Sequence, residues 1–215
     1  MLLPLVLAGL AAVAGCDLGA DDEDSGDRQP EAGGRGDRRS APPVKRLQRG
    51  GYLVVLRHAA TDPTATDMTG NLRDCSRQRN LNAEGRLQAR GIGRAFRRLG
   101  IPVGRVLASP FCRTRDTARL AFGRARPSRA LLSADFFGDD TAAVRQRAGL
   151  RRLLALPPRR GSNTVLVSHE AAIASATGVT VAEGEAVIVA PGRGRRRFQI
   201  VTTVEADAWD RSQLP

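Results

Sequence analysis

Short apolar runs that alternate with helix-like segments are the feature that most constrains the fold of this chain. The runs at 52–56, 103–108 and 164–168 are each long enough for one buried strand. Two of them, 52–56 and 164–168, contain no charged residue, which is typical of strands that are covered on both faces. Such strands occur in parallel sheets between two layers of helices. The pattern therefore predicts an α/β fold, a three-layer sandwich with a mostly parallel central sheet.

Segments with the apolar spacing of helices lie between the expected strands. Between the N-cap residue Asn82 and the stop residue Gly100, apolar side chains such as Ile92 and Phe96 recur at a spacing of three to four residues. Further helices are expected at 113–122, 139–156 and 171–176. Two more strands are expected at 186–189 and 198–204.

The first 15 residues are apolar and uncharged. They are too few to span a bilayer, which needs about 20 apolar residues, but they have the length of the apolar part of a signal peptide. They end at Val13-Ala14-Gly15-Cys16, which resembles the bacterial lipobox, where the cysteine is lipidated and becomes the mature N-terminus. No Lys or Arg precedes the apolar region, and the alternative interpretation is a buried N-terminal helix.

Residues 16–43 resemble a solvated tether. They contain eight acidic residues and four arginines, many Gly and Pro, and almost no large apolar side chains. The expected organisation is a lipoprotein signal peptide at 1–15, a lipidated Cys16 with a disordered acidic tether at 16–43, and a folded domain at 44–215. We therefore expect an exported protein of the cell envelope, anchored to the membrane through its N-terminal lipid.

The formal net charge of +12 combines two regions of opposite sign. The tether carries −4 and residues 44–215 carry +16, almost all of it arginine. Excess positive charge is a feature of nucleic-acid-binding proteins. Aromatic residues, however, make up only 4% of the chain and are not interleaved with the basic residues. Together with the expected export, this predicts no nucleic-acid partner. Two histidines and three cysteines leave little room for a zinc cluster.

Both histidines of the chain directly follow expected strands. His58 comes after the run 53–57, His169 comes after the run 164–168, and a third strand leads into the segment that contains Arg113. Because the carboxyl ends of parallel strands meet at one edge of a sheet, we expect both histidines, Arg57 and Arg113 to converge there. A nucleophilic imidazole surrounded by cationic donors suits a phosphoryl group.

Four sequence blocks surround these residues. They are Leu56-Arg57-His58-Ala59, NLNAEGRLQA at 80–89, SPFCRTRDTA at 109–118 and VLVSH at 165–169. Together and in this order they resemble the blocks of the histidine phosphatase (phosphoglycerate mutase-like) superfamily, with Ala59 replacing the Gly of its Arg-His-Gly signature. The sequences Asp74-Cys75 and Gln78-Arg79-Asn80-Leu81 further resemble those of an exported branch of this superfamily, which includes lipopolysaccharide-core heptose phosphatases.

The resemblance implies a role for each converging residue. His58 would attack phosphorus and form a phosphohistidine, while Arg57, Arg113 and His169 would hold the phosphoryl oxygens. No cofactor and no metal would be needed. The expected function is a phosphomonoester hydrolase acting on a small phosphorylated substrate, such as a sugar phosphate of the envelope. The change at Ala59 keeps one alternative open, a catalytically degenerate member that binds phosphorylated ligands.

The proton donor to the leaving oxygen has several candidates. Asp135 follows a short expected strand and matches the position of the acid in the mutase branch of the superfamily. Glu170, next to His169, matches the His-Asp pair of its acid phosphatase branch. Glu183 and Glu185 are further candidates, and the sequence leaves the choice open.

A long loop at 59–79, named here the access loop, has no clear periodicity and is expected to shape substrate access. Cys75 lies in this loop and Cys112 lies in the third sequence block. Because export leads to an oxidising compartment, we hypothesise a disulfide that pins the loop over the site, with two separate thiols as the alternative. Arg73, Arg77 and Arg79 of the loop are either further anion contacts or exposed residues.

Overall fold

The computed structural model describes residues 44–67, 71–133, 136, 140–192 and 197–209. The chain divides into the units Met1–Asp37 and Arg38–Pro215, and every described residue belongs to the second unit. The predicted signal peptide, Cys16 and the tether therefore lie outside the described residues, and so does Asp135. No helix in the described part of the chain is long and apolar enough to cross a membrane.

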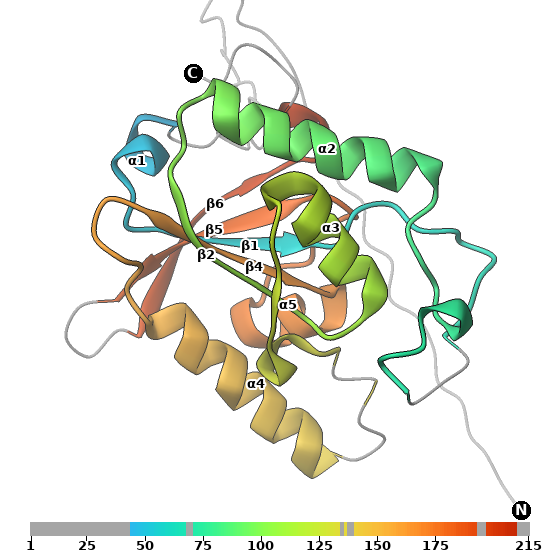
Figure 1. Cartoon of the computed structure of the whole chain (residues 1–215). Coiled ribbons are helices and arrows are strands. Elements are labelled where there is room, and N and C mark those ends of the chain that lie inside the picture. The colour runs from blue at the N-terminus through green and yellow to red at the C-terminus, as the bar shows by residue number, and fades with distance from the viewer. Residues whose placement is uncertain (1–43, 68–70, 134–135, 137–139, 193–196, 210–215) are drawn as a thin grey trace, which may run out of the picture. The chain divides into compact units, whose positions relative to one another are not determined.

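A six-stranded mixed sheet forms the centre of the fold, in the order β3-β2-β4-β1-β5-β6 (Figure 1). The strands are β1 (Leu53–Arg57), β2 (Val103–Ala108), β3 (Arg126–Pro127), β4 (Asn163–Ser168), β5 (Ala186–Pro191) and β6 (Phe198–Val204). The first four strands of the sheet order are parallel, and β5 and β6 pair antiparallel with their neighbours. The predicted α/β fold with a mostly parallel sheet is confirmed.

Helices cover both faces of the sheet. They are α1 (Val44–Arg49), α2 (Ala83–Arg98), α3 (Cys112–Phe122), α4 (Asp140–Ala155) and α5 (Glu170–Thr177). Three short 3₁₀ helices, η1 (Cys75–Arg77), η2 (Arg129–Leu131) and η4 (Asp207–Trp209), complete the described elements. Figure 1 shows α2 and α3 on one side of the sheet and α4 and α5 on the other.

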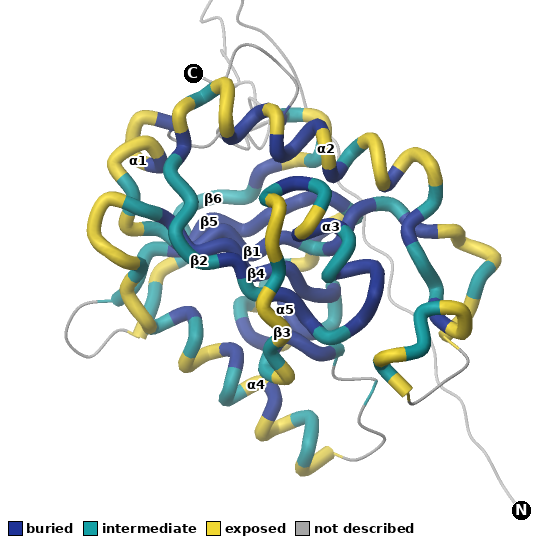
Figure 2. The backbone as a smooth tube through the Cα atoms, in the orientation of Figure 1, coloured by how far each residue is buried: buried dark blue, intermediate teal, exposed yellow. Residues whose placement is uncertain are grey.

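Strand β1 shows why the sheet needs both helical layers. Val54 and Leu56 pack with Ile92 and other side chains of one core cluster, while Leu53 and Val55 belong to a second cluster beneath α4 and α5. Successive strand residues point to opposite faces, so a run without polar residues must be buried on both. The tube in Figure 2 is accordingly buried along the central strands, whereas α2 and α4 alternate between buried and exposed turns.

The predicted helix boundaries agree with the structure to within one or two residues. Asn82 caps α2, since its Oδ1 accepts a hydrogen bond from the Gly85 amide at 2.7 Å. The chain after α2 turns at Gly100 with φ +61°, and α3 ends at Gly123 with φ +73°, the left-handed conformation that glycine adopts without strain.

One predicted element is wrong. The short strand expected just before Asp135 is replaced by η2, and the edge strand β3 lies earlier in the chain, with only two residues. Leu131 is fully buried in the cluster beneath α4 and α5 rather than extended along the sheet. The two adjacent leucines therefore anchor a turn against the core, a role that a short apolar run does not distinguish from a strand.

Candidate active site

Both histidines lie at the carboxyl edge of neighbouring parallel strands. Strands β1 and β4 pair in register with Arg57 opposite Ser168, and the His58 amide donates to the Ser168 carbonyl at 3.0 Å. This register places His58 and His169 side by side, with ring centroids 5.6 Å apart. The edge of the sheet thus brings together two residues that are more than 100 positions apart in the sequence.

A cavity of about 740 Å³ opens at this edge. All four residues expected to converge contribute to its wall, and so does Glu170. The described lining residues are Arg57, His58, Ala65, Thr66, Asp67, Arg79, Phe111, Arg113, Ser133, Phe136, His169, Glu170 and Ala171. Charged and polar side chains therefore dominate the wall, as an anionic ligand requires.

A hydrogen bond to one ring nitrogen of His58 fixes its tautomer and leaves the other ring nitrogen outside that bond. Its Nδ1 lies 2.9 Å from the Ala59 carbonyl oxygen. A carbonyl only accepts, so Nδ1 carries the proton and Nε2 keeps its lone pair. Burial lowers the pKa of His58 to about 3, against the opposing hydrogen bond to Ala59, and the charges of Arg113, Arg57 and Arg79 act in the same direction as burial. His58 is therefore neutral at pH 7.

His169 is also neutral. Burial lowers its pKa well below the usual value, and the charge of Arg113 adds to this effect. Its Nε2 is hydrogen-bonded to the Ser109 hydroxyl at 2.8 Å. The Phe111 ring packs edge-on against the imidazole, with centroids 5.0 Å apart. Ser109 and Phe111 therefore fix the orientation of the second histidine.

Two arginines approach the histidines from different elements. Arg57 at the end of β1 donates from Nη1 to Glu170 Oε2 and to the Val181 carbonyl, both at 2.8 Å. Arg113 on α3 donates from Nη1 to Asp67 Oδ1 at 2.9 Å. Its guanidinium also stacks 4.3 Å above the centroid of the Phe111 ring.

Three arginines of the cavity wall each have a buried Nε atom without a partner among the described residues. The Nε atoms of Arg57, Arg79 and Arg113 are buried and make no hydrogen bond within the described part of the chain. Buried donors of this kind are costly unless something accepts from them. Because these Nε atoms have almost no accessible surface, they mark three closely packed guanidinium groups rather than open ligand positions.

The candidate acids occupy different positions. Glu170 lines the cavity, and Asp135 lies outside the described residues. Glu183 is not part of the described wall and accepts from the Thr61 hydroxyl at 2.7 Å, with Oε1 3.8 Å from His58 Nδ1. Glu185 is buried, accepts from the Ala182 amide at 2.7 Å, and is likewise absent from the described wall. Glu183 and Glu185 therefore bind residues close to the site and are not part of the described cavity wall.

Asp67 is a site residue that the sequence did not reveal. Its Oδ1 accepts both from Arg113 Nη1 and from the Arg79 amide, each at 2.9 Å. It lies in the access loop, where no periodicity or motif distinguishes it from other exposed acidic residues. Only the folded path of the loop places it beside Arg113.

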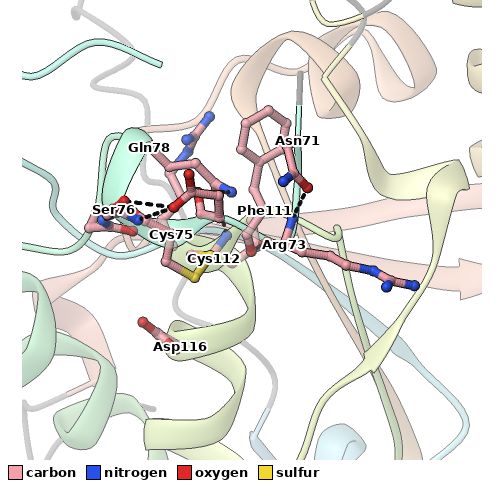
Figure 3. The surroundings of a disulfide bond; sticks show 12 residues. Asn71, Arg73, Cys75, Ser76, Gln78, Phe111, Cys112 and Asp116 are labelled. Atoms are coloured by element: carbon pink, nitrogen blue, oxygen red, sulfur yellow. Dashed lines mark hydrogen bonds between the residues drawn. A yellow bond between two sulfur atoms is a disulfide. The ribbon is translucent and has the colours of Figure 1, made fainter. Parts of the chain in front are cut away.

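The access loop is covalently attached to α3. Cys75 and Cys112 form a disulfide with their Cα atoms 5.7 Å apart (Figure 3). Next to it, Gln78 Oε1 accepts from the Cys112 amide at 2.9 Å, and Asn80 Nδ2 donates to the Cys75 carbonyl at 2.7 Å. These contacts fix the end of the loop to the first turn of the helix that carries Arg113.

The second sequence block positions the segment that follows His58. A Cβ atom on Gly85 would collide with the carbonyl oxygen of Ala60, so only glycine permits this close approach of α2. Gln88 accepts from the Ala60 amide at 3.0 Å. Ala59 is fully buried, and its amide donates to Thr117 Oγ1 at 3.0 Å. The extra methyl group of Ala59 thus packs away from the described cavity wall.

Comparison with known proteins agrees with this geometry. The family model for the histidine phosphatase superfamily (branch 1) matches residues 53–133, which include the first three sequence blocks. Among curated proteins, none matches the chain. A mycobacterial glucosyl-3-phosphoglycerate phosphatase, solved in complex with inorganic phosphate, is 19% identical, with 73% of this chain and 99% of that chain covered and a TM-score of 0.50.

A second mycobacterial structure, described as hydrolase 1, is 18% identical and covers the same shares, 73% of this chain and 99% of its own, with a TM-score of 0.51. The fold is phosphoglycerate mutase-like. At these identities the likeness concerns the fold, and the chemistry has to be argued from the residues of this chain.

Proposed function

We propose that this protein is a histidine phosphatase, a phosphomonoester hydrolase that acts without a cofactor through a phosphohistidine at His58. The observation that carries the proposal is the cavity wall, where the neutral His58 ring lies among the guanidinium groups of Arg57, Arg79 and Arg113. A nucleophile that is neutral at pH 7 and a cationic surround are the two requirements of phosphoryl transfer to nitrogen.

In the first step, His58 Nε2 attacks phosphorus and the bond from phosphorus to the leaving oxygen breaks. Arg57, Arg113 and His169 hold the non-bridging oxygens as their charge shifts. The ring becomes cationic as the new bond forms. The Ala59 carbonyl oxygen and the Glu183 carboxylate, whose Oε1 lies 3.8 Å from Nδ1, stabilise that positive charge. In the second step, water attacks phosphorus and gives a proton to the carboxylate that protonated the leaving group. The P–N bond breaks, and inorganic phosphate leaves.

The leaving oxygen needs a proton unless it is already a stable anion. We propose Glu170 as its source, because Glu170 lines the cavity beside His169. When the substrate binds, the hydrogen bond from Arg57 to Glu170 would go to a phosphoryl oxygen instead, and the released Glu170 carboxylate would take up a proton from solvent. Asp135 is the second candidate from the sequence.

The test is turnover of p-nitrophenyl phosphate by the wild type and by His58→Ala. We expect turnover by the wild type and a loss of at least about a thousandfold in the variant. Circular dichroism serves as the control that both proteins are folded. Rapid quenching of the wild type should trap phosphate on nitrogen, which is labile in acid and stable in base. A folded wild type without turnover that still binds inorganic phosphate would support the degenerate, ligand-binding alternative.

We also propose that the protein is exported and anchored in the cell envelope through a lipid on Cys16, where a small phosphorylated molecule is its substrate. The support is the apolar segment 1–15, the lipobox-like sequence and the acidic tether. Metabolic labelling with palmitate should mark the wild type and not Cys16→Ala. Recovery of both proteins in the soluble fraction, without label, would exclude the anchor.

A further inference from the structure

Arg79 differs from the other two arginines of the cavity because its side chain has no anionic partner. Arg57 is paired with Glu170, at 2.8 Å. Arg113 is paired with Asp67, at 2.9 Å. The Arg79 side chain makes no hydrogen bond and no ion pair to any described residue, although its Nε is buried. Among the described residues, this cationic charge of the wall therefore has no ion-pair partner.

The backbone of Arg79 is nevertheless held firmly. Its amide donates to Asp67 Oδ1 at 2.9 Å, and its carbonyl accepts from Arg113 Nη1 at 3.3 Å. The preceding residue, Gln78, is buried and hydrogen-bonded to the Cys112 amide, beside the disulfide in Figure 3. These backbone contacts keep Arg79 at the cavity wall, while its guanidinium has no hydrogen-bond partner among the described residues and is available to a ligand.

Arg79 reaches the cavity from a different element than the other two arginines. It approaches from the access loop, whereas Arg57 and Arg113 approach from β1 and α3. Its charge lowers the pKa of His58, as the larger effects of Arg113 and Arg57 do, so Arg79 shares the cavity with the two histidines. In the proposed mechanism, Arg57 and Arg113 hold the transferred phosphoryl group.

We propose that Arg79 binds a second anionic group of the substrate, a carboxylate or a second phosphate, on the part of the molecule that departs with the leaving oxygen. A guanidinium matches the planar or tetrahedral oxygens of such a group with two parallel hydrogen bonds. The proposal rests on the proposed phosphatase function for the identity of the first anion. It narrows the substrate class to phosphomonoesters with a second negative charge.

The test measures binding, so that it does not depend on turnover. Calorimetric titration of the full chain compares 3-phosphonopropionate with propylphosphonate, two phosphonates that cannot be hydrolysed as esters and differ in one carboxylate. We expect the wild type to bind 3-phosphonopropionate about tenfold more tightly, the range of one charge-assisted hydrogen-bonded pair at a half-exposed site. Arg79→Gln should remove this preference.

The matched control is Arg77→Gln, which deletes the same charge from the same loop at an exposed position. It should keep the tenfold preference. An equal weakening of both ligands by Arg79→Gln would overturn the proposal, because Arg79 would then belong to the phosphoryl clamp. A wild type that binds the two ligands equally, or binds neither, would overturn it as well. A preserved preference without turnover of p-nitrophenyl phosphate would refute the phosphatase function and leave the role of Arg79 intact.

Discussion

The two walls of the cavity are built in different ways. The sheet wall, formed by the ends of β1 and β4 with the first turn of α3, holds His58, His169, Arg57 and Arg113 through strand pairing and core packing. The loop wall, formed by the access loop, holds Asp67 and Arg79 through side-chain hydrogen bonds and one disulfide. In the proposed mechanism, the sheet wall therefore fixes the reacting groups, and the loop wall is the part that can select a substrate.

The largest expected effect comes from replacing the guanidinium of Arg113 in the sheet wall. Arg113→Lys keeps the charge but loses the fork that donates to two oxygens, so we expect kcat for p-nitrophenyl phosphate to fall by about a hundredfold. The control is Arg119→Lys, an exposed position on the same helix, which should keep full activity. Equal activities of the two variants would show that Arg113 does not clamp the phosphoryl group.

The proton donor can be separated from the clamp by the choice of leaving group. Glu170→Gln should lower kcat for an alkyl phosphate by about a hundredfold, because an alkoxide needs a proton to leave. It should hardly change kcat for p-nitrophenyl phosphate, whose phenolate leaves unaided. Steady-state rates on both substrates measure this, with Glu84→Gln on the exposed start of α2 as the control. A loss of the same size on both substrates would assign Glu170 to orienting Arg57 instead.

The loop wall can be loosened without touching the sheet wall. The disulfide closes a loop with a sequence separation of 37 residues, so Cys75→Ser should lower the free energy of unfolding by about 2–4 kcal/mol. Native-state hydrogen exchange should accelerate at residues 71–81 and stay slow at 53–57, because strand pairing does not depend on the disulfide. Denaturant unfolding of the wild type with and without reductant is the matching measurement. An unchanged midpoint in both comparisons would contradict this prediction.

The smallest expected effect is the absence of a titration. The chain has two histidines, so imidazole NMR signals report on the sheet wall alone. Because burial lowers the pKa of both, with His58 at about 3, neither signal should move between pH 5 and pH 8. A signal with a midpoint between pH 6 and pH 7 would show that one of the rings is not buried as described.

The same pKa shift has a consequence for stability. The unfolded chain takes up a proton on His58 near pH 6.5, while the folded protein does so only near pH 3. The unfolded state therefore binds more protons in this window, and the His58 contribution to the free energy of unfolding falls as the pH is lowered through it. It is fully present above pH 6.5. Thermal unfolding at several pH values, compared between the wild type and His58→Gln, isolates this contribution.

The sequence predicted the sheet wall better than the loop wall for a physical reason. The strands 53–57 and 163–168 are apolar on both faces, which requires a central position in a helix-covered parallel sheet. A histidine directly after such a strand can only lie at its carboxyl edge. The short strand expected before Asp135 was less well predicted, because the two-residue strand β3 lies earlier in the chain and η2, with the buried Leu131, follows it.

What the sequence by itself determined is the set of elements and the edge of the sheet at which both histidines and Arg57 and Arg113 lie, since periodicity and strand polarity fix these locally. Only the tertiary structure decided that Asp67 joins Arg113 to the Arg79 backbone and that Glu183 stands behind His58. It also decided that the Arg79 side chain lines the cavity without an ion pair to any other described residue. These contacts join segments that lie far apart in the chain, and a loop without periodicity takes its path from such contacts rather than from its own residues.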